Sequence, residues 1–278
     1  MTNPTMNKKE LATLKLFLDA QLKKHNQLSF VEKDPISIPH RFVVKQDIEI
    51  AGFFAAIFAW GNRTTIINKC NELIQLMDDD PYKFIIHHQE KELKHFLQFK
   101  HRTFNATDIL HLIRVLKHHY IDGYKLFGET EPSLESAFTH GMHKQDSDVE
   151  NALKGFHNYF FSLDESPPRT KKHISTPANN SSCKRLNMYL RWMVRKDEFG
   201  VDFGLWKQIK PSQLVCPLDV HVQRVAQNLN MISSEKSDWT TAANLTEILK
   251  KLDPSDPVKY DIALFSLGAS CDSFLFKV

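Results

Sequence analysis

The chain has 278 residues, of which 42% are hydrophobic and 25% charged, a balance typical of a soluble globular protein. This length suits one large domain or two modest lobes. The formal net charge of +3 permits a nucleic-acid-binding face but does not require one, since such a face needs clustered charge. Only nine residues are glycine, which argues against a glycine-rich nucleotide-binding α/β fold.

The cysteines Cys70, Cys183, Cys216 and Cys271 are far apart and form no CxxC pair. We therefore expect no disulfide framework, no zinc site and no iron–sulfur cluster. The opening residues are polar, and no apolar run approaches the ~18 residues that span a bilayer. These features predict a cytoplasmic protein without membrane contact.

Apolar residues recur at helical spacing along most of the chain, which predicts many helices of ordinary length. Proline-containing loops separate some of them, at residues 34–39 and in a basic loop at 164–182. No alternating strand of useful length is present, so the sequence predicts an all-α fold. In chain order the expected helices are 8–24, 47–60, 65–77, 81–88, 90–96, 106–120, 134–140, 148–161, 182–195, one from 219, 240–252 and 258–267.

The expected helix at 47–60 is apolar nearly all round, which is typical of a buried central helix. Gly61, Asn62, Arg63 and Thr64 then interrupt the apolar pattern. A polar break in a buried helix often faces a ligand, and Asn62 or Arg63 would then fill the gap left by an extruded nucleotide or contact its partner base. The alternative is a simple helix junction with Gly61 as the C-cap.

Two later helix starts carry chemically useful side chains. Lys184 opens an amphipathic helix, and Asp219 stands at the N-cap of the helix that follows Pro217. A lysine and an aspartate at the starts of two helices are candidates to face a common cleft.

Residues 217–225, with the sequence PLDVHVQRV, are similar to the V-D-T-H-V-x-R-V signature of the helix-hairpin-helix DNA glycosylase superfamily. The chain looks closest to a bacterial branch known mainly as a domain of unknown function. Lys184 matches the lysine that follows the hairpin in bifunctional members. Residues 262–269 resemble the final helix of such enzymes and residues 50–65 an early barrel helix, so the resemblance covers most of the chain from about residue 34.

The chain departs from the superfamily pattern at two places. The glycines four and two residues before the lysine are replaced by Asn180 and Ser182, and asparagine tolerates left-handed backbone better than serine does. Lys184 and Asp219 are 35 positions apart, longer than the usual spacing, which implies an insertion at about residues 196–212. The iron–sulfur cysteines of some members are missing.

The resemblance implies a two-lobed helical fold with a cleft between the lobes. Residues 45–212 would form a helical barrel lobe with the degenerate hairpin, and residues 1–44 with 213–278 a discontinuous second lobe. The implied function is cleavage of the N-glycosidic bond of a damaged or modified base in DNA. The implied partner is DNA, and we expect a monomer that needs no metal or other cofactor.

Asp219 would stabilise an oxocarbenium-like transition state or activate the attacking group. Lys184 would attack the sugar carbon and form a Schiff base, which leads to strand cleavage by an AP lyase reaction. Each residue has a simpler alternative, because Asp219 also suits a plain N-cap and Lys184 a solvated lysine or a phosphate contact.

Further residues are candidates for nucleic-acid binding or for simpler roles. His221 is expected to pack or hydrogen-bond beside Asp219, and Trp192 to belong to the core. The basic residues would meet phosphates or form a solvated charged face. The candidate nucleic-acid-binding residues are Asn62, Arg63, Lys171, Lys172, Asn180, Ser182, Arg185 and His221, and the wider basic set adds Arg169, Lys184, Arg191 and Arg195.

Two rival functions stay open. The first is a nucleic-acid-binding protein on the same scaffold without catalysis, and the second is an enzyme that acts on RNA or a nucleoside. The positions of Lys184 and Asp219 relative to each other discriminate between an enzyme and a binding module.

Overall fold

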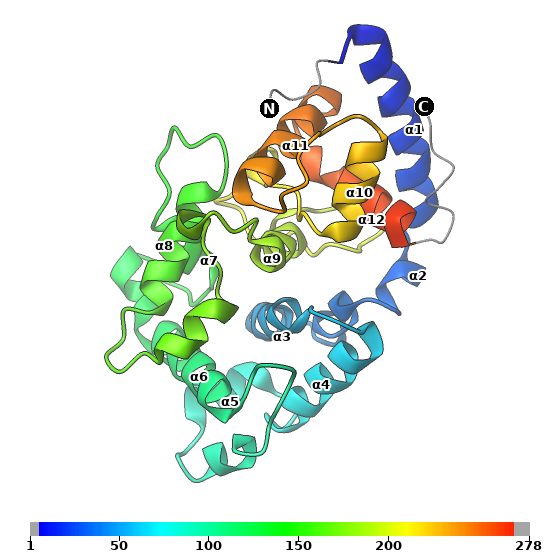
Figure 1. Ribbon diagram of the computed structural model, residues 1–278. Helices are drawn as coiled ribbons and strands as arrows, with labels where there is room; N and C mark the ends of the chain where they lie inside the picture. The colour runs from blue at the N-terminus through cyan, green and yellow to red at the C-terminus, as the bar shows by residue number, and fades with distance from the viewer. Residues whose placement is uncertain (1–5, 270–278) are drawn as a thin grey trace. The chain divides into compact units, whose positions relative to one another are not determined.

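The computed structural model describes residues 6–269, which contain α- and 3₁₀-helices, isolated β-bridges and no strand (Figure 1). The predicted all-α class is therefore confirmed for this part of the chain. The α-helices are α1 (Lys8–His25), α2 (Leu28–Val31), α3 (Lys45–Phe58), α4 (Arg63–Gln75), α5 (Pro81–His87), α6 (Ala106–Ile121), α7 (Glu135–Thr139), α8 (Glu150–Phe160), α9 (Lys184–Val194), α10 (Val220–Asn228), α11 (Trp239–Leu252) and α12 (Asp261–Ala269). The 3₁₀-helices are η1 (Pro35–Ser37), η2 (Pro39–Arg41), η3 (Glu92–Phe96), η4 (Gly123–Phe127), η5 (Pro168–His173), η6 (Pro177–Asn179), η7 (Pro211–Gln213) and η8 (Pro257–Tyr260).

The chain divides into two compact units. Over the described residues, unit 1 comprises 6–30, 145–150 and 176–269, and unit 2 comprises 31–144 and 151–175. This division differs from the expected one, because residues 176–212 belong with the C-terminal helices and residues 31–44 with the helices that follow them. Residues 176–212 belong to unit 1 because the side chains of α9 are buried against other parts of that unit.

In unit 1, α12 packs along both α10 and α1, and α11 contacts α1 and η8. Figure 1 shows α10, α11 and α12 grouped with α1. Gly268 of α12 permits the close approach to α10, because a Cβ at this position would lie 2.7 Å from the backbone oxygen of His221. The glycine therefore determines how near α12 comes to the start of α10.

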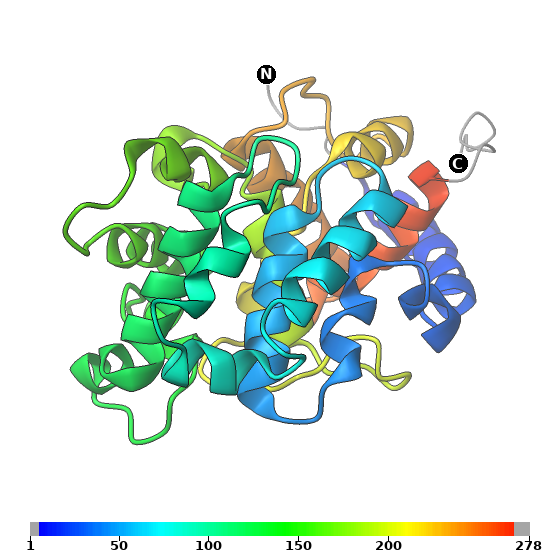
Figure 2. The same cartoon turned by 90° about the horizontal axis from the view of Figure 1, so that it is seen from below.

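In unit 2, α3 is the central helix and packs against α4 and α5, as Figure 2 shows from below. Every residue of α3 from Asp47 to Phe58 is buried, which confirms the prediction made from its apolar sequence. The buried carboxylate of Glu49 accepts hydrogen bonds from Tyr120 Oη (2.8 Å), Ser133 Oγ (2.5 Å) and the Leu134 amide (3.1 Å). This carboxylate holds α6 and the start of α7 to α3.

Side chains cap the starts of several α-helices, namely α1, α4, α5, α6, α10 and α11. Asp80 caps α5 by accepting a hydrogen bond from the Lys83 amide at 3.3 Å. Asn105 is the N-cap of α6. The Asp108 carboxylate accepts a hydrogen bond from the Asn105 amide at 3.0 Å and completes a capping box. The expected helix at 90–96 is the 3₁₀-helix η3.

Candidate active site

The loop before α9 has left-handed backbone at two residues, Asn180 (φ 55°) and Cys183 (φ 49°). Asparagine tolerates this conformation, so Asn180 does what a glycine does at that place in the superfamily pattern. Ser182, the other glycine substitute, is not in this region. Cys183, the N-cap of α9, has left-handed backbone. The second left-handed residue is therefore one position later than Ser182, where the superfamily pattern has its second glycine.

Residues that open α11 hold this loop in place. Ser181 forms a β-bridge with Asp238, and the Trp239 amide donates to the Asn180 carbonyl at 3.3 Å. Asp238 also caps α11 by accepting from the Thr241 amide at 2.9 Å. The α11 cap therefore anchors the turn that aims Lys184. From the sequence, Asp238 can be recognised only as a capping aspartate ahead of a helix. Nothing in the local pattern indicates that it contacts the loop at residues 180–181.

The inner face of α9 is fully buried. Leu186, Tyr189, Leu190 and Met193 are each 0–1% exposed, which confirms the amphipathic prediction. Trp192 is 0% exposed and belongs to the core, also as predicted. These contacts fix the axis of the helix that Lys184 begins.

The arginines of α9 are the clearest difference from the predicted basic surface. Arg191 pairs with Asp261 and, at 3.3 Å, with Asp202, while Arg195 pairs with Asp202 and, at 2.8 Å, with Asp256. Both arginines are buried, and carboxylates of unit 1 pair with their guanidinium groups, so these groups are not available to phosphate.

The long connection after α9 packs on that helix and is not an open insertion. The Phe203 amide donates to the Trp192 carbonyl at 2.8 Å, and the Trp206 amide to the Met193 carbonyl at 2.9 Å. Trp206 is buried with its ring edge-on to Tyr189, centroids 5.3 Å apart. Residues 203–206 therefore pack against the last turn of α9, and Asp219 lies beside Lys184 at the start of that helix despite the 35-residue separation.

Asp219 has two roles in this structure. Its Oδ1 accepts from the amides of His221 and Val222, both at 2.9 Å, and so caps α10. Its Oδ2 lies 3.2 Å from Lys184 Nζ. The side chain of Lys184 is 32% exposed and that of Asp219 is 11% exposed. The structure thus unites the two predicted catalytic residues in one partly accessible pair.

Three neighbours of this pair can be placed. His221 Nδ1 lies 2.9 Å from the Gly268 carbonyl, which confirms a hydrogen-bonding role beside Asp219. Ser182 Oγ lies 3.5 Å from the Leu218 carbonyl and links the hairpin to the segment that carries Asp219. Arg185 is half-buried, and burial lowers the pKa of its guanidinium to about 10.

Asp261, the first residue of α12, is an acidic neighbour that the sequence pattern did not single out. Burial raises the pKa of its carboxyl to about 6, the Arg191 guanidinium opposes the rise, and the Asp219 carboxylate adds to it. The network holds two guanidinium groups and three carboxyl groups, so one protonated carboxyl would balance its charge.

The remaining predicted residues belong to unit 2. Asn62 is exposed and caps α4 by accepting from the Thr65 amide at 3.1 Å, and Arg63 begins that helix. Lys171 and Lys172 are exposed on η5.

A family described as "Protein of unknown function (DUF2400)" matches residues 34–270. The chain belongs to this DUF2400 family. No curated protein and no solved structure matches the chain. The family description names no activity, so the glycosylase resemblance stays an expectation for this DUF2400 member.

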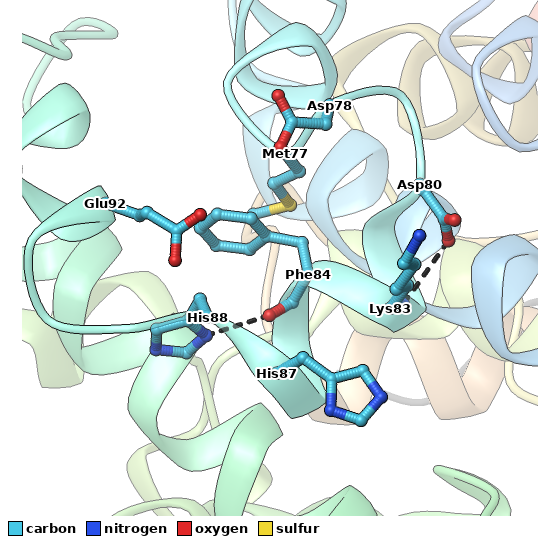
Figure 3. A pocket seen from close by; sticks show the side chains of 8 residues that line it. All are labelled: Met77, Asp78, Asp80, Lys83, Phe84, His87, His88 and Glu92. Carbon is cyan, nitrogen blue, oxygen red and sulfur yellow. Dashed lines mark hydrogen bonds between the residues drawn. The ribbon is translucent and has the colours of Figure 1, made fainter.

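One pocket of this DUF2400 chain lies in unit 2, around the turn between α4 and α5 (Figure 3). In Figure 3 the His88 ring turns back to the Phe84 carbonyl, 2.9 Å from Nδ1. The pocket contains none of the predicted site residues. Its lining residues are Met77, Asp78, Asp80, Lys83, Phe84, His87, His88 and Glu92.

Two features are absent from residues 6–269. This part of the DUF2400 chain has no group of three or more His, Cys, Asp or Glu side chains placed to hold a metal ion. It also has no helix long and apolar enough to cross a membrane. Of the cysteines, Cys70, Cys183 and Cys216 are buried, and Cys271 lies outside the described residues.

Proposed function

We propose that this DUF2400 chain is a DNA glycosylase-like enzyme that removes a damaged or modified base by cleaving its N-glycosidic bond. The observation that supports the proposal is the 3.2 Å contact between Lys184 Nζ and Asp219 Oδ2. Two helix starts, 35 residues apart in sequence, bring an amine and a carboxylate together where both are partly exposed. Such a pair can supply a nucleophile and a base.

Asp219 is suited to act on the charge that develops at the sugar. Cleavage of the N-glycosidic bond leaves positive charge on the sugar ring, and a fixed carboxylate stabilises that charge without reorganising. The two amides that bind Oδ1 hold the carboxylate still, while Oδ2 faces the Lys184 amine. The cap therefore fixes the orientation of the group that would act.

Lys184 would attack the anomeric carbon as the neutral amine. Asp219 Oδ2 is within hydrogen-bonding reach of Nζ and can accept the proton that the ammonium releases. Attack would form a bond from Nζ to the sugar carbon while the bond to the base breaks, and the base would leave with the electron pair of that bond. Transfer of a proton from Nζ through Asp219 to the ring oxygen would then open the sugar ring, give a Schiff base and restore the carboxylate. This route leads to strand cleavage, which makes lyase activity part of the proposal.

Replacement of Asp219 by asparagine tests the catalytic assignment. The amide oxygen can still cap α10, so we expect the free energy of unfolding to fall by no more than ~1 kcal/mol. Excision should fall by about 100-fold or more, because the negative charge is lost. The measurement is base release from a panel of lesion-bearing oligonucleotides, with alkali used to reveal abasic sites.

Asp80→Asn is the matched control for this test, because Asp80 caps α5 through the Lys83 backbone amide at 3.3 Å and lies outside the Lys184–Asp219 pair. It should lose similar stability and retain excision. Excision by Asp219→Asn at the wild-type rate, on a substrate that the wild type processes, would remove Asp219 from the mechanism.

The structure also offers one observation for a binding module without catalysis. Both oxygens of Asp219 already have partners, Oδ1 in the α10 cap and Oδ2 at Lys184. The pair would then serve only to join the starts of α9 and α10. A protein that binds the lesion panel but releases no base from any member would favour this second function.

A further inference from the structure

Trp60 is exceptional among the four tryptophans of the chain. Trp192, Trp206 and Trp239 are 0%, 1% and 7% exposed, whereas Trp60 is 43% exposed. It follows α3, a helix that is otherwise buried on all sides, and it stands immediately before the Gly61 break. Hydrophobic packing does not explain why an indole lies at the surface here.

A second unusual feature lies over the indole. The guanidinium carbon of Arg102 is 4.3 Å from the centroid of the Trp60 ring, a cation–π geometry. Arg102 has left-handed backbone (φ 55°), which costs a non-glycine residue roughly 1 kcal/mol or more. Gly61 has φ 107°, and a Cβ there would lie 2.3 Å from Arg102 Nη1. Gly61 thus makes room for the arginine that covers Trp60.

The turn that carries Arg102 is held at both sides. His101 and Phe104 exchange backbone hydrogen bonds of 3.2 and 2.8 Å, and His101 Nε2 lies 3.0 Å from the Phe58 carbonyl at the end of α3. These bonds fix Arg102 relative to Trp60. The strain at Arg102 is therefore maintained by its surroundings, a pattern typical of functional sites.

Cations of η5 are tied to the same turn. Arg169 Nη2 donates to the Thr103 carbonyl at 3.0 Å and lies 3.3 Å from the buried Asp108 carboxylate. Thr170 Oγ1 donates to Asp108 at 2.7 Å, so Asp108 anchors η5 next to residue 103. Lys171 and Lys172, the next two residues, are exposed.

We propose that Trp60 and Arg102, here called the Trp60 platform, stack against an unpaired base of a nucleic acid whose phosphates meet Lys171 and Lys172. An exposed indole and a planar guanidinium both offer faces on which any base stacks. Neighbouring lysines supply the attraction for the backbone. The inference takes nucleic acid as the ligand from the proposed function and adds a base-binding surface in unit 2.

Tryptophan fluorescence and strand binding test the platform in the full-length chain. Because the other three tryptophans are buried, binding of a short oligothymidylate should quench emission mainly from Trp60. Trp60→Ala should abolish the quenching and weaken binding about tenfold or more at fixed salt, measured by anisotropy of a labelled strand. Trp60→Phe, which keeps an aromatic face, should bind almost as tightly as the wild type without the quenching.

A strand of the same length made of abasic sites separates stacking from phosphate contact. The wild type should bind it less tightly than oligothymidylate, and Trp60→Ala should bind it as the wild type does. Lys172→Glu should weaken binding to both strands alike. Equal affinity of the wild type for the two strands, unchanged affinity in Trp60→Ala, or no binding of either strand would overturn the proposal.

This outcome is separable from that of the excision assay. A wild type that releases bases while its Trp60→Ala variant binds and quenches normally would leave the glycosylase proposal intact and remove the platform. Binding that depends on the bases and on Trp60, without excision from any substrate, would support the platform and remove the glycosylase proposal.

Discussion

At the scale of single residues, the role of Lys184 determines whether the product is a cleaved strand or an intact abasic strand. Its amine lies 3.2 Å from Asp219 and is 32% exposed, so it can be reached by a sugar carbon. If it attacks, borohydride should trap a covalent enzyme–DNA adduct, and cleaved strands should appear without alkali. We expect Lys184→Gln to lose both signals, as measured on denaturing gels with a labelled substrate.

The exposed Lys196, which follows α9, provides a matched control, and Lys196→Gln should still form the adduct. An intact abasic product with no trapped adduct would show instead that Asp219 activates water. In that case Lys184 would contact phosphate, and Lys184→Gln would weaken binding without changing the product.

Residue identity alone did not reveal which cations are available. Lys171 and Lys172 are exposed, but Arg191 and Arg195, which the sequence groups with them, are buried in ion pairs. The half-buried Arg185 is intermediate, and its reversal to glutamate would place an acid in a site whose burial already lowers the pKa of the arginine. Charge-reversal experiments therefore belong on Lys171 and Lys172.

At the scale of secondary-structure elements, the α10–α12 contact determines where Asp219 stands. Gly268→Ala would place a methyl group 2.7 Å from the His221 carbonyl oxygen, a backbone atom that cannot rotate away. Overpacking costs about 1–3 kcal/mol, and the better helix propensity of alanine offsets up to ~1 kcal/mol. We expect a net loss of about 1 kcal/mol in the free energy of unfolding, measured by denaturant titration, together with slower excision.

Ser266→Ala, on the same helix, removes an oxygen and adds no bulk at this contact, so it should leave excision unchanged. A Gly268→Ala variant as stable and active as the wild type would mean that α12 does not position the start of α10.

At the scale of the whole molecule, the buried ion network predicts how stability depends on pH. The pKa of Asp261 is raised to about 6 in the folded chain, against an ordinary value of 3.8. The folded state therefore holds a proton that the unfolded state has lost between these pH values. The contribution of Asp261 to stability is fully present below pH 3.8 and is lost as pH rises through 6.

Asp261→Asn removes this titration and isolates it from the other acids. The free energy of unfolding of the wild type, relative to the variant, should fall by up to about 1.4 kcal/mol per pH unit between roughly pH 4 and 6. Denaturant titrations of both proteins across this range provide the measurement. Parallel pH profiles would show that Asp261 keeps its ordinary pKa.

The sequence by itself determined the helices, because helix formation depends on local periodicity and on capping side chains. The burial of α3 followed from its apolar composition, and Asp219 was recognisable as an N-cap from the residues after it. The resemblance also selected Lys184 and Asp219 as a pair. These predictions required only residues close together in the chain.

Only the tertiary structure decided which helices meet and which charges are neutralised. The Lys184–Asp219 contact joins the starts of two helices 35 positions apart, which no local pattern encodes. Arg191 and Arg195 are buried in pairs with Asp202 of the connection after α9 and with Asp256 and Asp261, which lie more than 60 positions farther along the chain. An amphipathic pattern tells which face of a helix is apolar, but its covering partner depends on packing between segments far apart in sequence.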